Sequence, residues 1–219
     1  MPLIYPYVNR GMGKKLHLPR DNDPIGLIIH TTGSGPWSRQ RRYPRFDTPG
    51  EAAVYMYERG THAGPHYVVC GERGTIWQGT PDDHIAWHVG GDRSWVYKAP
   101  GWDRKCKWWK KRWPEYSSPR DLLGGSLWRE GSANKLTLGI DVAPPLIGPR
   151  APWTDACWKS LSWLTNKLCL EYGIIHDSAH IFTHSDAHPR KRTTDSGKPW
   201  DPAKMQWEGR QSVYRLTYP

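Results

Sequence analysis

The chain has 219 residues, and 31 Lys and Arg against 21 Asp and Glu give it a net charge of +10 at pH 7. This length suffices for one domain with a buried core, and the charge favours a polyanionic partner such as nucleic acid, an anionic cell-wall polymer or an acidic membrane surface. Twenty-two Gly and 20 Pro predict many turns and argue against a helical bundle. No apolar run approaches the ~18 residues of a membrane span, and the N-terminal stretch lacks the layout of a secretory signal, so we expect no membrane insertion.

The first elements of the chain lead to a core strand that ends on a histidine. Residues 1–24 are expected to form an irregular arm. Residues 25–32 read IGLIIHTT, an apolar and partly β-branched run that predicts a buried strand with His30 at its C-terminal end. In α/β folds this end of a strand is where ligand chemistry lies. Next, Thr48-Pro49-Gly50-Glu51 is a capping box with Pro at the first helical position, and it predicts a short helix that ends at Gly60.

Two further short segments precede a change in composition. Residues 66–70 (HYVVC) and 75–78 (TIWQ), separated by a Gly-centred turn, predict a β-hairpin. Residues 85–88 are expected to add one more short strand. From residue 92 to 132 there are six Trp, and ten Lys or Arg stand against five Asp or Glu. A loop of this length in a compact domain is usually functional or disordered, and we treat it as a basic, Trp-rich insertion.

The C-terminal half returns to regular elements. Residues 135–142 alternate as a strand. Residues 154–172 predict the longest helix, with Thr154 as its cap, leucines along one face and Gly173 at its end. Residues 181–184 form a strand that delivers a second histidine. Strands alternate with helices, but a hairpin is present, so the predicted fold class is α/β: a single domain over residues 1–219 with a central mixed β-sheet flanked by helices.

Five blocks, in this order along the chain, are similar to those of one family. That family is the zinc-dependent N-acetylmuramoyl-L-alanine amidases, which includes phage lysins, muropeptide-recycling amidases and peptidoglycan recognition proteins. Each block is weak alone, but the ordered set is specific and covers a core of about residues 25–207. The blocks are LIIHTT (27–32), PHYVVCGERGTIWQ (65–78), AWHVG (86–90), NKLTLGID (134–141) and THSDAHPRKRTTDSGKPWDP (183–202).

The resemblance implies a catalytic zinc held by three protein ligands, with a fourth position left for water. His30 and His184, each at the end of a predicted strand, match the family's two histidine ligands. The third ligand in the family is a carboxylate or thiolate that follows the second histidine. Zinc lowers the pKa of its water to about 7 and polarises the amide carbonyl.

Two residues compete for the place of the third ligand. Asp201 keeps the family's Asp-Pro pair, with Pro202, but requires an insertion of about seven loop-forming residues. Asp195 requires almost no insertion, but Ser196 follows it in place of Pro. A single turn-rich insertion is the smaller departure, so we assign Asp201 and keep Asp195 as the alternative. Asp186 is then expected to cap or support the loop.

The resemblance also implies residues for proton transfer and for charge stabilisation. A carboxylate has to take and return a proton, and Asp141 occupies the place where recycling enzymes carry the longer Glu. Other members use a Tyr just before the HYVV-like block, where this chain has Pro65. Arg192 falls where the family has a Lys that steadies the oxyanion, and Arg is a fixed cation able to serve there. Without the resemblance, Asp141 would be interpreted as the ion-pair partner at a strand end.

Five residues are predicted to meet the substrate or shape its groove. His66 and His88 are candidates either for substrate contacts or for support of the site, and Asn134 is expected to hold the loop beside it. Trp108 and Trp109 of the insertion can stack on sugar faces, and the positive charge around them suits an anionic glycan.

The chain is therefore predicted to be a zinc-dependent peptidoglycan amidase that cleaves between N-acetylmuramic acid and the L-alanine of the stem peptide. Its setting stays open among a phage lysin, a recycling enzyme and an antibacterial toxin delivered by a secretion or injection machine. A toxin would bring an inhibitor or immunity protein as a partner. The protein is expected to be made in the cytoplasm and, as a lysin or toxin, to act in the periplasm or cell wall after delivery or lysis.

Two other function classes compete with this interpretation. A recognition module that binds peptidoglycan without cleaving it would lack a metal ligand, and the match at His30, His184 and Asp201 argues against that. A single-stranded nucleic-acid binder is suggested by residues 104–113 (RKCKWWKKRW), where basic residues alternate with aromatic ones. No recognised nucleic-acid motif accompanies that patch, so we rank this alternative last.

Overall fold

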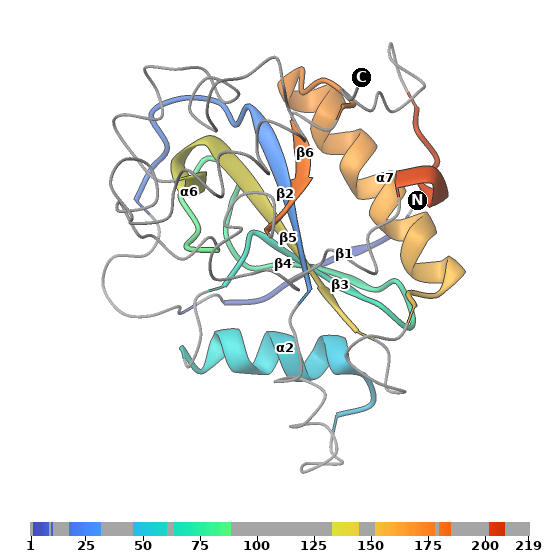
Figure 1. Ribbon diagram of the computed structural model, residues 1–219. Helices are drawn as coiled ribbons and strands as arrows, with labels where there is room; N and C mark the ends of the chain where they lie inside the picture. The colour runs from blue at the N-terminus through green and yellow to red at the C-terminus, as the bar shows by residue number, and fades with distance from the viewer. Residues whose placement is uncertain are drawn as a thin grey trace, which may run out of the picture.

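The computed structural model describes residues 2–8, 10, 18–31, 46–60, 64–88, 133–144, 152–177, 180–184 and 202–208. Six strands in these ranges form one mixed sheet in the order β1-β4-β3-β5-β2-β6 (Figure 1). Strands β3 and β4 are the predicted antiparallel hairpin, and the other neighbouring pairs are parallel. The strands are β1 (Ile4–Pro6), β2 (Gly26–Thr31), β3 (Tyr67–Cys70), β4 (Ile76–Gln78), β5 (Thr137–Ala143) and β6 (Ile181–Thr183).

Helices flank the sheet, so the predicted α/β fold class is confirmed. Helix α7 (Asp155–Tyr172) begins after Thr154, whose side chain accepts a hydrogen bond from the Cys157 N–H, and it ends at Gly173, which has a left-handed φ of 66°. Helix α2 (Pro49–Glu58) begins after Thr48, which caps the Glu51 N–H. Two short segments complete the set, α6 (Ala133–Leu136) and the 3-10 turn η2 (Pro202–Lys204).

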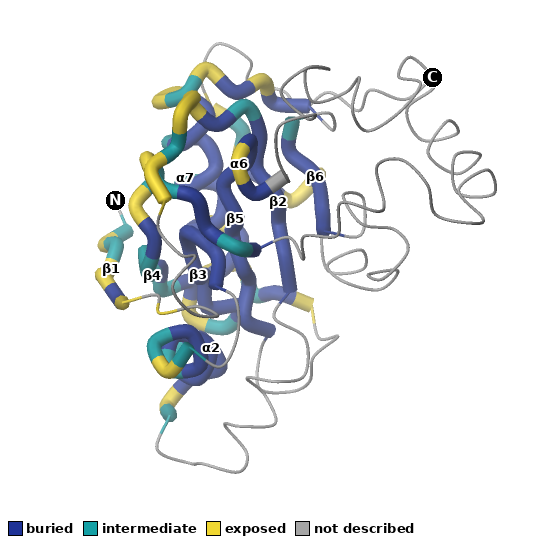
Figure 2. Tube along the Cα trace, turned by 90° about the vertical axis from the view of Figure 1, so that its left-hand side faces the viewer, coloured by how far each residue is buried: buried dark blue, intermediate teal, exposed yellow. Residues whose placement is uncertain are grey.

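The two long helices pack against opposite faces of the sheet. Leu27 and Ile29 of β2 belong to the main core cluster, together with the fully buried Leu161, Leu164 and Leu168 of α7. Because side chains alternate along a strand, residues 28 and 30 of β2 face the other side. On that side Val68 of β3 and Ala143 of β5 pack against α2. The central strands are consequently buried on both faces, as Figure 2 shows in dark blue.

The N-terminal arm is more regular than predicted. Ile4–Pro6 form β1, which adds a parallel edge strand beside β4 and continues as the Tyr7 N–H donates to the Gln78 carbonyl. Three residues are too few to show periodicity, and Pro6 fits a strand only because β1 lies at the edge of the sheet. The expectation of a wholly irregular arm was therefore wrong.

Residues 85–88 do not form the predicted strand. The Ile85 N–H donates to the carbonyl of Leu18, and the His88 N–H donates to Asn134 Oδ1, so these amides pair with the arm and a side chain. Likewise, residues 135 and 136 belong to α6, and β5 begins only at Thr137. In both places irregular or helical backbone pairs its polar groups without a strand ladder.

One arginine joins the arm to both of these segments. The guanidinium of Arg20 donates to the carbonyls of Asp82 (3.1 Å), His84 (3.2 Å) and Thr137 (3.2 Å). It also donates to the carbonyl of Lys135 in α6. A planar fork of five donors suits four carbonyls that come from separate segments. Arg20 thereby holds residues 82–88 against the start of β5.

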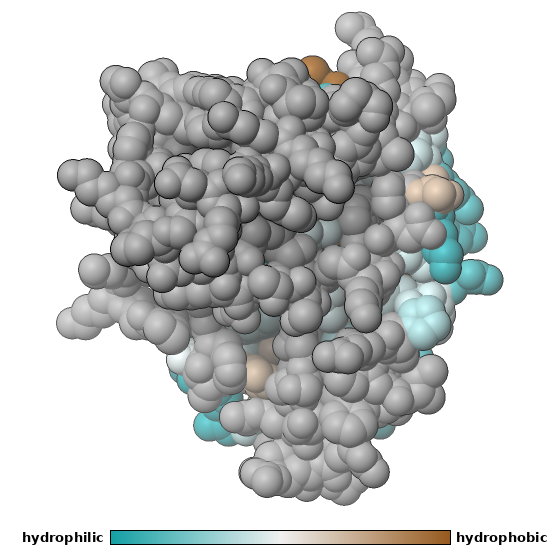
Figure 3. All heavy atoms as spheres, viewed as in Figure 1, coloured by the Kyte–Doolittle hydropathy of each residue, from teal (hydrophilic) through white to brown (hydrophobic). Residues whose placement is uncertain are grey.

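The surface of the described part is mainly hydrophilic where Figure 3 displays it. Among the residues that the structure describes, no helix is long and apolar enough to cross a membrane. The basic, Trp-rich insertion at residues 92–132 lies outside the described residues, and the domain boundaries stay a prediction.

Candidate active site

Three neighbouring parallel strands deliver the predicted polar residues to one edge of the sheet. His30 of β2 is the register partner of Asp141 on β5, and Ile29 is the partner of Thr183 on β6. His184 follows Thr183 directly, so it lies beside His30. Parallel strands end at the same edge, and the strand register therefore assembles His30, Asp141 and His184 on the face that α2 covers.

The two histidines face each other through the same ring nitrogen. His30 Nδ1 lies 2.9 Å from His184 Nδ1, and the ring centroids are 4.5 Å apart with the planes at 72°. Only 3 % of His30 and 2 % of His184 are exposed. Two buried imidazole nitrogens that face each other at this distance either share a proton or bind one cation together.

A third imidazole, His88, contacts the other nitrogen of His30. His88 Nδ1 lies 2.9 Å from His30 Nε2, and His88 Nε2 lies 3.3 Å from the Thr137 carbonyl. Burial, together with the nearby His66, lowers the pKa of His88 well below its usual value, so the ring is neutral. A carbonyl only accepts, so we assign the proton of His88 to Nε2. Nδ1 then accepts from His30 Nε2–H, and the lone pair of His30 Nδ1 faces His184.

Asn134 of α6 and Gly139 of β5 determine where the ring of His88 lies. Asn134 Oδ1 accepts the His88 N–H at 3.0 Å, which supports the expectation that Asn134 holds this loop. Gly139 of β5 lies beneath the ring, and a Cβ there would be 2.3 Å from His88 Cγ. Glycine is required at this position because no larger residue leaves room for the imidazole.

Asp141 connects the histidines to helix α2. Its Oδ1 lies 3.9 Å from His30 Nδ1, and its Oδ2 accepts a hydrogen bond from the Tyr57 hydroxyl. Tyr57 lies in none of the five family-like blocks and was not predicted as a functional residue. The only signal is its spacing from Ala53 and Val54, which puts it on the sheet-facing side of α2.

His66 contacts two backbone groups and the side chain of Arg20, whose Nη2 lies 3.1 Å from His66 Nε2. It is fully buried, its Nδ1 accepts from the Gly139 N–H at 3.0 Å, and its Nε2 lies 3.0 Å from the His84 carbonyl. Both ring nitrogens thus join β3 and the 82–88 segment to β5. Contact of His66 or His88 with substrate stays a prediction, and their observed contacts favour support of the site.

The model of one protein family, described as N-acetylmuramoyl-L-alanine amidase, matches residues 20–198. The chain belongs to the N-acetylmuramoyl-L-alanine amidase family. This membership makes it a peptidoglycan amidase, and the match contains His30, Asp141 and His184. None of the curated proteins matches the chain.

Solved structures support the amidase fold. A crystal structure of a selenomethionine AmpD derivative is 19% identical, with 92% of this chain and 91% of that chain covered and a TM-score of 0.52. The catalytic domain of XlyA is 15% identical, with 86% and 88% covered and a TM-score of 0.52. At these identities the likeness concerns the fold alone.

Several predicted site residues of the amidase lie outside the described residues. Among the residues that are described, no group of three or more His, Cys, Asp or Glu is arranged to hold a metal ion. The described part thus contains two of the three predicted ligands, His30 and His184, and the whole ligand set stays a prediction. The residues outside the described part are Asp201, Asp195, Asp186, Arg192, Trp108 and Trp109.

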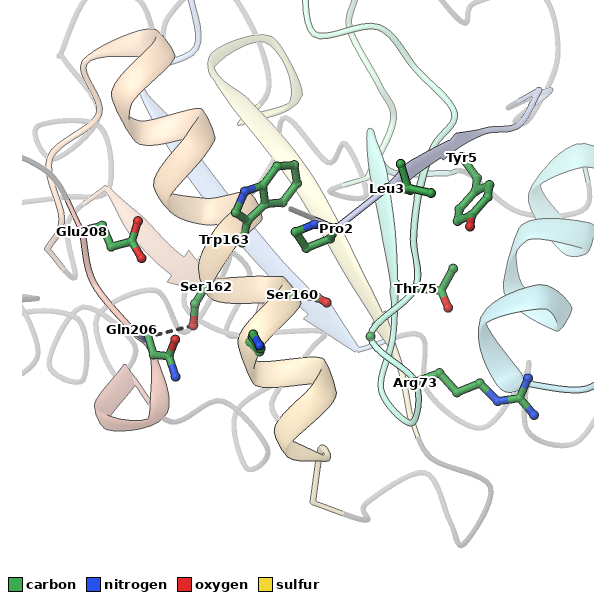
Figure 4. A pocket seen from close by; sticks show the side chains of 12 residues that line it. Pro2, Leu3, Tyr5, Arg73, Thr75, Ser160, Ser162, Trp163, Gln206 and Glu208 are labelled. Carbon is green, nitrogen blue, oxygen red and sulfur yellow. Dashed lines mark hydrogen bonds between the residues drawn. The ribbon is translucent and has the colours of Figure 1, made fainter.

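The amidase has an open pocket on another part of its surface. It lies between β1 and α7, and Leu3, Tyr5, Arg73 and Trp163 are among its lining residues (Figure 4). None of the described residues of the candidate site lines it. The pocket is therefore separate from the histidine pair.

Proposed function

We propose that this amidase is zinc-dependent and hydrolyses the amide between the lactyl group of N-acetylmuramic acid and the L-alanine of the stem peptide. The observation that carries the proposal is the facing pair of Nδ1 atoms of His30 and His184, 2.9 Å apart, with the Asp141 carboxylate beside it. Family membership supplies the substrate class.

The described residues fit zinc by the chemistry of their donors. Imidazole nitrogens are preferred zinc ligands, and His30 presents Nδ1 while its Nε2 is engaged by His88. Histidine ligands of metals nearly always have such a partner on the other nitrogen. We propose His30 and His184 as two ligands and Asp201 as the third. Zinc at this place would supply a Lewis acid that polarises a carbonyl oxygen and makes water a better nucleophile.

The residues of the chain then have separate tasks in the hydrolysis. Asp141 accepts a proton from the attacking water, whose oxygen bonds to the amide carbon. When the C–N bond breaks, Asp141 returns that proton to the leaving nitrogen, which becomes the free amino group of L-alanine. We propose that Arg192 stabilises the negative charge on the carbonyl oxygen. The products are the carboxylate of the muramic acid lactyl group and a shortened peptide.

The bond cleaved identifies the reaction. Digestion of purified peptidoglycan should release new L-alanine amino termini without raising the number of reducing sugar ends. Reducing ends without amino termini would identify a glycosidase and refute the assignment. The Asp141→Asn variant should retain zinc but lose about 10²–10⁴-fold in turnover, the usual contribution of a general base. An Asp141→Asn variant as fast as the parent would place the base elsewhere.

The proposed setting is lysis of a cell wall, with the chain acting outside the cytoplasm as a phage lysin or a delivered toxin. The net charge of +10 supports attraction to an anionic wall. Expression in the periplasm should lyse bacteria, whereas cytoplasmic expression should not. Rescue by a neighbouring gene product would identify an immunity protein and favour the toxin. If bacteria survive periplasmic expression as well as they survive cytoplasmic expression, a lytic role would be contradicted.

A further inference from the structure

Tyr57 contacts the carboxylate to which we assign proton transfer. Its hydroxyl donates a hydrogen bond to Asp141 Oδ2, across 84 positions of sequence. Only 5 % of Tyr57 and 7 % of Asp141 are exposed. A hydrogen bond to a buried carboxylate is stronger than one in water, because little solvent competes for the acceptor.

The ring of Tyr57 is fixed by packing. It lies in the cluster that α2 forms with Val68 of β3 and Ala143 of β5, and its centroid is 6.4 Å from that of Tyr7. A tyrosine ring held on several sides leaves its hydroxyl little freedom, since only two side-chain torsions position it. Helix α2 therefore brings a hydroxyl to a set position beneath the carboxylate.

The two oxygens of Asp141 consequently face different partners. Oδ2 is engaged by Tyr57, and Oδ1 lies 3.9 Å from His30 Nδ1, toward the histidine pair. Aspartate has one methylene and a terminal torsion that rotates easily. A bond at one oxygen stops that rotation and thereby fixes the direction of the other oxygen.

We propose that Tyr57 is a positioning residue of the amidase, whose hydroxyl holds Asp141 with Oδ1 directed at the reacting amide. The inference rests on the proposed function, since it assumes that Asp141 transfers the proton. Proton transfer requires donor and acceptor within hydrogen-bond reach, and a displacement of about 1 Å can cost roughly 10²-fold in rate. Loss of the hydroxyl should therefore lower kcat and leave KM nearly unchanged, because Tyr57 acts on the base rather than on the bound substrate.

The test compares two variants that each remove one buried hydroxyl from the same cluster. Tyr57→Phe removes the donor to Asp141. Tyr7→Phe is the matched control, because the Tyr7 hydroxyl lies 3.5 Å from the Pro65 carbonyl and its ring packs beside Tyr57. With a soluble muropeptide as substrate, Tyr57→Phe should lose roughly 10–100-fold in kcat with zinc content unchanged, and Tyr7→Phe should keep the parent's kcat.

A double-variant cycle separates positioning from general damage to the fold. In an Asp141→Ala background the Tyr57→Phe change should have no further effect on kcat, since there is no carboxylate left to hold. If Tyr57→Phe is poorly folded by its melting temperature, Tyr57→Met also lacks the hydroxyl and should give the same loss.

Three results would overturn the inference: a Tyr57→Phe variant as fast as the parent, an equal loss in Tyr7→Phe, or losses that multiply in the Asp141→Ala background. Each leaves the proposed function intact provided that the parent is active and Asp141→Ala is slow. A parent without amidase activity, or an Asp141→Ala variant at parental speed, would instead refute the proposed function and the inference with it.

Discussion

His30 and Asp141 are register partners on adjacent parallel strands, and His30 Nδ1 lies 3.9 Å from Asp141 Oδ1. The distance between a predicted metal ligand and a predicted proton acceptor is thus set by main-chain pairing. A shift of β2 against β5 by one residue would turn His30 to the opposite face, among the leucines of α7. The buried strands on both sides oppose that shift, so the arrangement of these two side chains is held by the core of the sheet.

Removal of either His30 or His184 should abolish zinc binding but preserve the fold. His30→Ala and His184→Ala each remove one of the two facing nitrogens, whereas the apolar residues of β2 and β6 remain. Zinc content by elemental analysis and far-UV circular dichroism check the two expectations. His180→Ala is the control, because His180 bonds to Asp177 through its Nδ1 and belongs to the same segment. A zinc-loaded, fully active His184→Ala variant would contradict the assignment.

Replacement of His88 should weaken zinc binding without removing a ligand. His88→Phe takes away the acceptor that holds His30 Nε2, and loss of such a partner typically costs about 10–100-fold in metal affinity. Gly139→Ala should act in the same direction, because its Cβ would displace the His88 ring. Competition with a zinc chelator measures the affinity. The control is His84→Gln, at a partly exposed histidine, which should bind zinc like the parent. Unchanged zinc affinity in both His88→Phe and Gly139→Ala would refute the supporting role of His88.

The third ligand can be identified by comparing two aspartates outside the described residues. Asp201→Ala should lose zinc, and Asp195→Ala should keep it, since only Asp201 is followed by the proline that stiffens a ligand's loop. Metal content of the two purified variants decides between them. The reverse result would show that the tail contains no insertion between His184 and its ligand.

The described cysteines should be inert toward thiol reagents in the folded protein. Cys70 and Cys157 are completely buried and Cys169 nearly so. Burial raises the pKa of Cys157 well above its usual value and that of Cys169 to about 12, so neither forms thiolate at pH 8. Mass spectrometry after iodoacetamide treatment should find these three unmodified until urea unfolds the chain. Rapid native labelling of Cys157 would mean that α7 opens away from the sheet.

The sequence predicts those parts of the site that follow directly from a strand. His30 and His184 stood out because each follows an apolar run that predicts a strand, whereas their roles, and the choice of Asp141, came from the resemblance to the amidase family. The cap and end of α7 were predictable for a similarly local reason, since the Thr154 side chain accepts a hydrogen bond from an N–H only three residues away and Gly173 adopts a left-handed backbone.

Contacts between distant segments were not predictable in this way. Tyr57 reaches Asp141 only because α2 packs on the same face as residues 30 and 141, a fact of tertiary structure. His88 was visible as a residue of a motif, but its contact with His30 depends on the space above Gly139. Strand β1 was missed because its pairing with β4 crosses some 70 residues and leaves no periodic pattern in three residues.

The contacts of the Arg20 guanidinium indicate at what stage of folding the candidate site is completed. The guanidinium joins backbone groups that are 62 to 117 residues away along the chain, at Asp82 and Thr137. Contacts so distant in sequence are expected late in folding, after the local elements exist. The loop that carries His88 is therefore fixed only once β5 has been made and docked, and His184 comes later still. For the proposed zinc site, we therefore expect metal to load only after the chain has been synthesised as far as His184 and the sheet has assembled.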